Sequence, residues 1–508
     1  MKNVQKYKAL ILGILLLTGA SLRFYNLNWG APFYFHPDER NITDLVLKTS
    51  LSNPQSLLKG TFAYGNFPVI LTIFLKPLFL PFFRLLQVTD PFAQAIIILR
   101  FISAIFSTLT LYIIYLCGKF WSKKTAYLSL FFATFSAGLI QQAHFGTYDG
   151  SAAFCSITVF YFLLKFLKTK KARFYYLSII FIAIGVSAKI NLLILAIFPA
   201  ILLLTRLKKQ KKALLYIFMH AILGIILLLA LAITLSPYYI TPEFKSSLTY
   251  EQSLVTGTIP VFYTQSFFGT VPVLFQFQHI LPFLINPILT IIFIPSFFLV
   301  LYKSLKTQKQ QYLILNTFYL ILFLPQAFFF AKWTRYMVPA LPFIYLIIAI
   351  ALHDVIARSE ATKQSLDLPA GRQGLPRSFQ SLAMTILIFV NILFGVSYFI
   401  TAFTRSDTRI EAANFAKNNI PQNAEILSEP YDLGLTPFNS VSSNITIFNF
   451  YELDNNSPEF TDQKLTASLQ KSDYIILPSQ RLLRSRLLSS KQFPKGHGFY
   501  SLLINEAA

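Results

Sequence analysis

Apolar runs long enough to cross a bilayer recur along most of the 508-residue chain. A helix of about 20 residues spans the hydrocarbon core, and inside lipid a segment must satisfy its own backbone hydrogen bonds. The chain is 55% hydrophobic and only 13% charged, a balance typical of membrane proteins with many spans. We therefore predict a polytopic α-helical membrane protein.

The charge pattern sets the orientation of these helices. A net charge of +23 could indicate a nucleic acid partner, but the basic residues cluster in short loops between apolar runs, as cytoplasmic retention of Lys and Arg produces. No nucleic acid partner is therefore expected. Cys117 and Cys155 fall in apolar segments, so neither a disulfide framework nor a metal site is expected. The basic loops run from Lys119 to Lys124, Lys165 to Arg173, Arg206 to Lys212, Lys303 to Lys309 and Arg358 to Arg377.

Neighbouring basic loops must enclose an even number of crossings, and this rule divides one long apolar segment. Residues 174–205 would form a helix about 48 Å long, whereas the hydrocarbon core is about 30 Å thick. We predict two short helices that turn near residues 187–191, with Lys189 at the external surface. Residues 67–86 contain three prolines, which interrupt helices, so a helix or pair of helices along the membrane surface is expected there. The count is eleven membrane helices, with an uncleaved first helix at about 8–27.

Two domains are predicted. Residues 1–403 form the membrane domain, with external loops at about 28–97 and 236–280 and a cytoplasmic insert at about 359–380. Residues 404–508 carry 11 acidic and 10 basic residues, a near balance that fits a small external α/β domain. The N-terminus would then be cytoplasmic and the C-terminal domain extracytoplasmic, in a plasma (inner) membrane. The predicted strands of the tail are Ala424–Ser428, Ile445–Phe450 and Asp473–Leu477, and its predicted helices end near 418 and span Thr461–Lys471.

Two adjacent carboxylates, Asp38 and Glu39, follow the first helix and lie between His36 and Arg40. A carboxylate sheltered by apolar surface has a raised pKa and accepts a proton more readily, so this group predicts a general base with an orienting neighbour. A plainer alternative stays open, in which these charges only mark the start of a loop.

Other polar residues gather at the remaining external turns. His144, Thr147 and Asp149 lie between the third and fourth helices, where they would bond a sugar hydroxyl, support Asp38, or only cap a helix. External Lys and Arg beside apolar runs are unusual, and a lipid-linked phosphate needs such partners; snorkelling to the interface is the alternative. These external cations are Arg100, Lys189, Lys332 and Arg335.

The chain has no Gly-rich phosphate loop, no Walker motif and no Cys/His metal spacing. A cytosolic nucleotide substrate is therefore not supported, and a phosphate-bearing substrate would be reached from the membrane lipid.

An ordered set of motifs resembles glycosyltransferase family 39, which contains protein O-mannosyltransferases and lipid A aminoarabinose transferases of the GT-C membrane fold. The similarity runs through about residues 8–403. The residues that carry it are Arg23, His36-Pro37-Asp38-Glu39, Tyr64-Gly65-Asn66-Phe67-Pro68, Arg100-Phe101-Ile102-Ser103-Ala104, His144-Phe145-Gly146-Thr147-Tyr148-Asp149, Ser187-Ala188-Lys189 and Arg335-Tyr336-Met337-Val338-Pro339-Ala340-Leu341-Pro342.

The resemblance implies a glycosyltransferase that takes a hexose or pentose from a polyprenyl-phosphate donor on the external face. It implies that Asp38 is the base, that Arg100 and Lys189 bind the donor phosphate, and that Lys332 and Arg335 assist; Tyr336 lies in the last motif and is expected at the substrate. The acceptor would be the hydroxyl of a protein, a lipid or a glycan. Cationic residues can stabilise the leaving phosphate, so no metal is strictly required, and a divalent cation stays open.

Two functions of other classes remain as alternatives. A transporter or flippase of a lipid-linked saccharide would use the same cationic groove without a base, although transporters often show internal repeats and none is found here. A receptor or scaffold would place the function in the tail.

Overall fold

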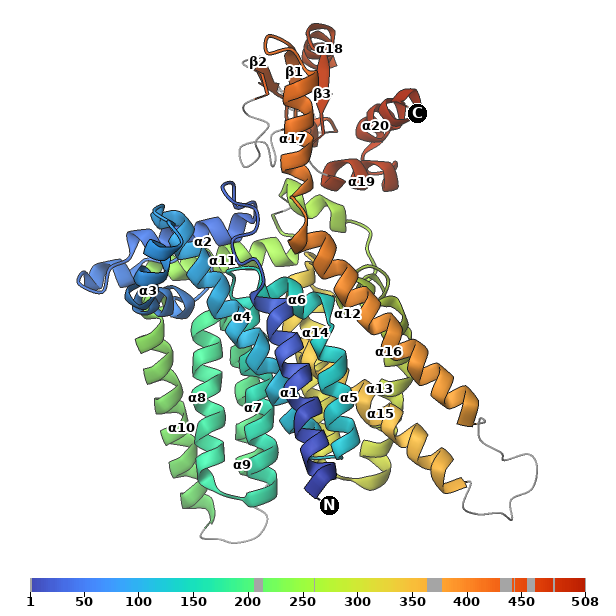
Figure 1. Cartoon of the computed structure of the whole chain (residues 1–508). Coiled ribbons are helices and arrows are strands. Elements are labelled where there is room, and N and C mark those ends of the chain that lie inside the picture. The colour runs from blue at the N-terminus through green and yellow to red at the C-terminus, as the bar shows by residue number, and fades with distance from the viewer. Residues whose placement is uncertain are drawn as a thin grey trace. The chain divides into compact units, whose positions relative to one another are not determined.

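The protein is described by a computed structural model (Figure 1), which covers residues 2–204, 213–259, 261–362, 377–429, 441–442, 444–454, 462–477 and 480–507. Most of the predicted cytoplasmic insert lies outside these residues. The chain divides into two compact units, which are treated separately. The first comprises Met1–Asn28, His36–Glu251 and Val271–Phe403, and the second comprises Trp29–Phe35, Gln252–Thr270 and Thr404–Ala508.

Long apolar helices make up most of the first unit. Nine helical segments of the described residues are long and apolar enough to cross a membrane. The span in α7 is 78% buried, whereas that in α10 is 22% buried, so α7 lies at the core of the unit and α10 at its surface. The α-helices that overlap these spans are α1 (Lys2–Phe24), α3 (Phe67–Leu85), α4 (Pro91–Gly118), α7 (Asp149–Thr169), α10 (Ala213–Leu235), α13 (Pro287–Thr307), α14 (Gln310–Phe328), α15 (Leu341–Thr362) and α16 (Arg377–Phe399).

The predicted division of residues 174–205 is confirmed. Helix α8 (Ala172–Ala188) ends at Lys189, whose backbone is extended, and the chain continues through the 3-10 helix η2 (Ile190–Ala196) into α9 (Ile197–Leu204). The loop that follows α1, predicted to be external, pairs with this break through an antiparallel bridge between Tyr64 and Lys189. The amide of Gly65 also donates to the Ala188 carbonyl at 3.1 Å. A side chain at Gly65 would place its Cβ 2.0 Å from the Ser187 carbonyl oxygen, so glycine permits this close approach.

A second break lies between α5 (Lys123–Thr134) and α6 (Ala137–Ala143). The last carbonyls of a helix have no partner within it, and here the buried guanidinium of Arg23 serves them. It donates to the carbonyls of Ala133 at 3.0 Å and Thr134 at 3.2 Å, and to the Ser107 hydroxyl at 2.9 Å. Arg23 therefore joins α1 to α4 and α5 through contacts that are buried away from solvent.

The two loops of the first unit that are predicted to be external contain α2 (Pro37–Lys48), η1 (Pro54–Leu58), α3, η4 (Pro237–Ile240) and most of α11 (Pro242–Thr256). Helix α3 is continuous despite Pro77 and Pro81. The prolines therefore do not split it into two helices, and its place at a membrane surface stays a prediction. Shorter elements complete the unit: η6 (Gln276–Ile280), α12 (Leu281–Ile285), η7 (Thr334–Ala340) and η9 (Ile400–Thr404).

The second unit contains a three-stranded parallel sheet in the order β2-β1-β3. All three predicted strands are present, each shorter than predicted. Leu427, Phe450 and Tyr500 are fully buried in its core. The elements are β1 (Glu425–Ser428), β2 (Asn444–Ile447), β3 (Tyr474–Ile476), η5 (Phe262–Phe267), η12 (Phe450–Glu452), α17 (Thr408–Asn419), α18 (Asp462–Lys471), α19 (Gln480–Leu488) and α20 (Pro494–Ala507).

Candidate active site

The two adjacent carboxylates occupy the first turn of α2. His36 is the N-cap, and its Nδ1 accepts from the Glu39 amide at 3.4 Å, while Pro37 takes the first helical position. Proline suits that position because its missing N–H would have no partner there, and acidic residues favour the positive end of a helix. The local sequence therefore starts the helix here and carries both carboxylates on it.

Glu39 is closed off from solvent by Arg100. The guanidinium of Arg100 donates from Nε and Nη2 to the two carboxylate oxygens at 2.7 Å each, and both side chains are fully buried. The Gly146 amide donates to the same carboxylate at 2.7 Å, and Arg100 also donates to the Leu27 carbonyl at 2.8 Å. The predicted roles of Glu39 in catalysis and of Arg100 in phosphate binding are not supported by this geometry, because each group is occupied by the other.

Asp38 points to a different partner and stays accessible. Its carboxylate forms an ion pair with Arg335, which lies in η7 (Thr334–Ala340), far from α2 in the sequence. The side chains are 22% and 23% exposed, so neither is sealed from solvent. An accessible carboxylate next to an accessible cation can accept a proton while the cation meets a developing negative charge.

A second, more buried ion pair joins Lys189 at the α8–η2 break to Asp149 at the start of α7. Their Nζ to Oδ1 distance is 2.7 Å, and the Thr147 hydroxyl donates to the other oxygen at 3.3 Å. The Lys189 ammonium lies 5.3 Å from the ring centroid of Tyr336 and 5.9 Å from that of Tyr64. Tyr336 directly follows Arg335, so the two ion pairs lie on neighbouring parts of one site.

The pKa of His36 also shows that charged groups from several elements lie close together. Burial lowers the pKa of His36 to about 4, and the charges of Glu39 and Asp149 oppose this shift while Arg335 and Arg100 add to it. These charged groups come from α2, α4, α7 and η7, so the loops predicted to be external do meet. The His36 ring also lies 4.5 Å from the Phe145 ring, and it is neutral near pH 7.

Three other predicted residues make contacts of a simpler kind. Both ring nitrogens of the buried His144 face backbone carbonyls, those of Ile140 and Tyr25, at 2.9 Å. Lys332 is 4% exposed and donates to the Phe330 carbonyl at 3.2 Å, and burial lowers its pKa. The Arg40 guanidinium lies 5.4 Å from the Phe92 ring centroid. His144 therefore holds the turn between α6 and α7 in place. Lys332 places a buried ammonium group just before η7 in the chain.

Two residues beside the second ion pair were not singled out from the sequence. The pKa of Glu251 in α11 is raised by burial, with Lys189 acting in the opposite direction. Burial raises the pKa of Tyr64, and the charges of Asp149 and Glu251 add to this effect. Tyr64 stands in the motif Tyr64-Gly65-Asn66-Phe67-Pro68, and its position there could have marked it as a site residue. Glu251 could have been found as one of only two acidic residues in the second external loop.

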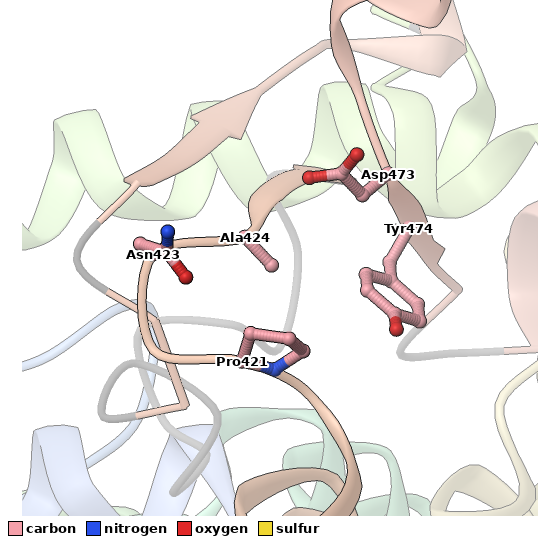
Figure 2. A pocket seen from close by; sticks show the side chains of 5 residues that line it. All are labelled: Pro421, Asn423, Ala424, Asp473 and Tyr474. Carbon is pink, nitrogen blue, oxygen red and sulfur yellow. The ribbon is translucent and has the colours of Figure 1, made fainter.

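Neither a metal-binding cluster nor a surface hollow provides a second candidate site among the described residues. Over the residues that the structure describes, no group of three or more His, Cys, Asp or Glu side chains is arranged to hold a metal ion. A surface hollow of about 480 Å³ in the second unit is lined by Pro421, Asn423, Ala424, Asp473 and Tyr474 (Figure 2). It lies at the amino ends of β1 and β3, whereas ligands of parallel sheets bind at the carboxyl ends. We assign it no function.

Comparison with known proteins supports the predicted fold. Residues 81–238 match the family model described as dolichyl-phosphate-mannose-protein mannosyltransferase, which confirms the resemblance over that stretch. The stretch includes Arg100, Asp149 and Lys189 but neither Asp38 nor Arg335. No curated protein sequence matches the chain.

Solved structures extend the likeness to the whole chain. The apo oligosaccharyltransferase of Archaeoglobus fulgidus is 13% identical at a TM-score of 0.57, over 96% of this chain and 72% of that one. The oligosaccharyltransferase AglB of the same organism, in complex with an inhibitory peptide and a dolichol-phosphate, gives a TM-score of 0.54 at 13% identity over 97% and 72%. ArnT from Cupriavidus metallidurans gives 0.49 at 13% identity over 96% and 89%, too low to add weight. The fold is that of a GT-C integral membrane protein with a small α/β domain; the count of eleven helices stays a prediction.

Proposed function

We propose that this GT-C protein is a glycosyltransferase that moves a sugar from a polyprenyl-phosphate donor to an acceptor hydroxyl on the external face of the membrane. The fold and the family model support the reaction class. The residues of the site support the chemistry, and they assign separate tasks to the charged groups.

The observation that carries the proposal is the accessible ion pair of Asp38 and Arg335. Of the two carboxylates in the first turn of α2, only Asp38 is within reach of a substrate, since Glu39 is sealed by Arg100. A general base must reach the proton that it takes. Arg335 can exchange the carboxylate of Asp38 for a phosphate oxygen, because a guanidinium binds both kinds of oxyanion.

The reaction then runs as one displacement. The acceptor hydroxyl gives its proton to the Asp38 carboxylate, and its oxygen attacks the anomeric carbon. The bond from that carbon to the phosphate oxygen breaks, and the electron pair leaves with polyprenyl phosphate. Arg335 stabilises the charge of the leaving group, and Lys332, three positions earlier in the chain, is proposed to assist it. The anomeric centre is inverted, and no metal is required by this scheme.

The remaining charged residues position this centre. Glu39 and Arg100 tie α2 to α4, so that Asp38 on the neighbouring position is held outward. Lys189 and Asp149 hold the α8–η2 break beside Tyr64 and Tyr336, whose aromatic rings would line the sugar or the phosphate. Lys189 can also reach a donor phosphate once it exchanges partners with Asp149.

Turnover tests the proposal. The purified chain in lipid nanodiscs is given polyprenyl-phosphate hexose and pentose donors with labelled sugar, together with hydroxyl peptides, lipids or glycans as acceptors. We expect sugar transfer to an acceptor and release of polyprenyl phosphate, with Asp38→Asn lowering the rate by about 10²–10⁴-fold. Asp44→Asn is the matched control, because Asp44 is an exposed carboxylate on the same helix.

The outcomes separate the candidate functions. Movement of the lipid-linked sugar across the bilayer without cleavage would identify a transporter or flippase and contradict the proposal. Full transfer by the Asp38→Asn variant would show that another group is the base.

A further inference from the structure

The second unit contains more than the C-terminal domain. Trp29–Phe35 from the first external loop and Gln252–Thr270 from the second belong to it. The first of these segments leads directly into the α2 cap at His36, and the second follows Glu251. The C-terminal domain is thus packed with two stretches of chain that border candidate site residues in the sequence.

The first segment is folded into a tight turn. Gly30 has a φ of +72°, which favours glycine, and its carbonyl accepts from the amides of Phe33 at 2.9 Å and Tyr34 at 2.8 Å. The rings of Phe33 and Phe35 stack with centroids 5.8 Å apart. Phe35 is only 3% exposed, so the turn ends on a buried aromatic ring.

Arg409 of α17 covers that ring. Its guanidinium carbon lies 3.8 Å from the Phe35 centroid, within the range of a cation–π contact. Asp407, the N-cap of α17, accepts from Arg409 Nε at 2.8 Å and Nη2 at 2.7 Å, which fixes the plane of the guanidinium over the ring. These hydrogen bonds also lower the pKa of Asp407 despite its partial burial, so the pair stays charged.

Arg486 of α19 makes a corresponding contact to the second segment. It is fully buried, donates to the Gln265 side-chain oxygen at 2.7 Å and lies 3.7 Å from the Phe493 ring centroid. Asp454 supplies the opposite charge, at 3.7 Å from Nε. The rings of Phe268 and Phe493 are 6.4 Å apart. Both segments are therefore held by an arginine that is itself oriented by an aspartate.

We propose that the C-terminal domain is a positioning module that holds the two external loops through Arg409 and Arg486, and so fixes the entry of the chain into the catalytic segment. Asp38 lies three positions after Phe35, a reach of at most about 11 Å, so motion of the Phe35 turn displaces the proposed base directly. The positioning role rests on the function proposed above, whereas the anchoring itself does not. Arg409 and Arg486 are positioning residues and touch no substrate.

Arg409→Ala, with Arg409→Lys beside it, tests the first anchor in the full chain. Hydrogen exchange is measured at the amides of Phe33 and Tyr34, which the turn protects, and kcat, acceptor KM and donor affinity are measured in nanodiscs. We expect exchange to rise about tenfold or more and kcat to fall about tenfold with donor affinity unchanged. Arg409→Lys should restore exchange protection and kcat only in part, because lysine lacks the planar group that pairs with the Asp407 carboxylate.

Arg405→Ala is the matched control, an exposed arginine shortly before α17, and it should match the wild type in every measurement. Unchanged exchange in Arg409→Ala would overturn the anchor. Faster exchange with wild-type kcat would overturn the positioning role. Hydrogen exchange does not depend on turnover. If the chain transfers no sugar, the proposed function is refuted, and the exchange measurement still shows whether Arg409 holds the Phe35 turn.

The second anchor is tested from the loop side, since removal of the buried Arg486 endangers folding. Gln265→Ala leaves Arg486 its contact with Asp454, and we expect faster exchange within Gln252–Thr270 together with a rise in acceptor KM. Exchange equal to the wild type in that segment would show that Arg486 does not hold the loop.

Discussion

Replacing Glu39 with glutamine is the sharpest test of whether the two adjacent carboxylates, Asp38 and Glu39, have different roles. The substitution keeps the shape of the side chain and removes its charge. One oxygen can still accept from Arg100 Nε and from the Gly146 amide, both at 2.7 Å in the native protein. The new amide nitrogen must face Arg100 Nη2, so that two donors meet and a fully buried guanidinium loses its counter-charge.

The size of the effect follows from this burial. Breaking a buried pair by removing one partner costs about 3–5 kcal/mol, because the remaining charge is uncompensated. Asp38→Asn at the adjacent position removes a pair that is more than one fifth exposed, where the cost is about 0–1 kcal/mol. Neighbouring substitutions of the same type should therefore differ by several-fold in their effect on the free energy of unfolding.

The measurement is thermal unfolding of the detergent-purified chain followed by fluorescence, alongside transfer activity per folded molecule. We expect Glu39→Gln to lower the unfolding midpoint by several degrees. Its activity should fall only because α2, which carries Asp38, is held less firmly. Asp38→Asn should leave the midpoint near that of the wild type and lower the transfer rate by about 10²–10⁴-fold. The double replacement Glu39→Leu with Arg100→Met should recover most of the lost stability.

The opposite pattern would refute the assignment. If Glu39→Gln were as stable as Asp38→Asn and as inactive, Glu39 would have to meet the substrate, and the closed pair with Arg100 would not describe the working enzyme.

Three further predictions concern the same site. Lys189→Met should cost about 3–5 kcal/mol by stranding the Asp149 carboxylate, and Lys189→Met with Asp149→Leu should restore stability in unfolding measurements but not activity. Because the pKa of His36 is lowered to about 4, the unfolded chain binds a proton between pH 6.5 and 4 that the folded chain resists. Stability should therefore fall by up to about 3 kcal/mol as the pH drops through that window, and His36→Asn, which keeps a capping side chain, should flatten the profile of unfolding midpoint against pH. Gly65→Ala should cost about 1–3 kcal/mol by overpacking against the Ser187 carbonyl, measured as a lower unfolding midpoint, and an unchanged midpoint would contradict the close approach.

Segment lengths and loop charges were enough to predict a helical membrane protein with many spans, because hydrophobic length is a property of each segment alone. They did not settle every span, since Phe67–Leu85 is long and apolar enough to cross a membrane although its prolines led us to place it along the surface. The division at Lys189 followed from the same rule. The strands of the tail could also be predicted, since each is a short run of apolar and β-branched residues.

The roles of Asp38 and Glu39 could not be separated from the sequence. Successive positions of a helix point about 100° apart, so adjacent carboxylates face different partners, and nothing in the sequence says that one faces Arg100 and the other Arg335. The contact of Phe35 with Arg409 was also beyond prediction, because it joins residues that are far apart in the chain. The break after α5 depends on Arg23, which the sequence shows only as a charge in the first helix.

The bridge between Tyr64 and Lys189 has a consequence for biogenesis. The extended backbone at Lys189 interrupts the hydrogen bonds of the α8–α9 hairpin, and lipid offers no substitute partners. The segment around Tyr64 and Gly65, whose Gly65 amide donates to the Ala188 carbonyl, is synthesised before the hairpin. The partner of this break is therefore made before the break itself, so the hairpin can close against it without waiting for the rest of the chain.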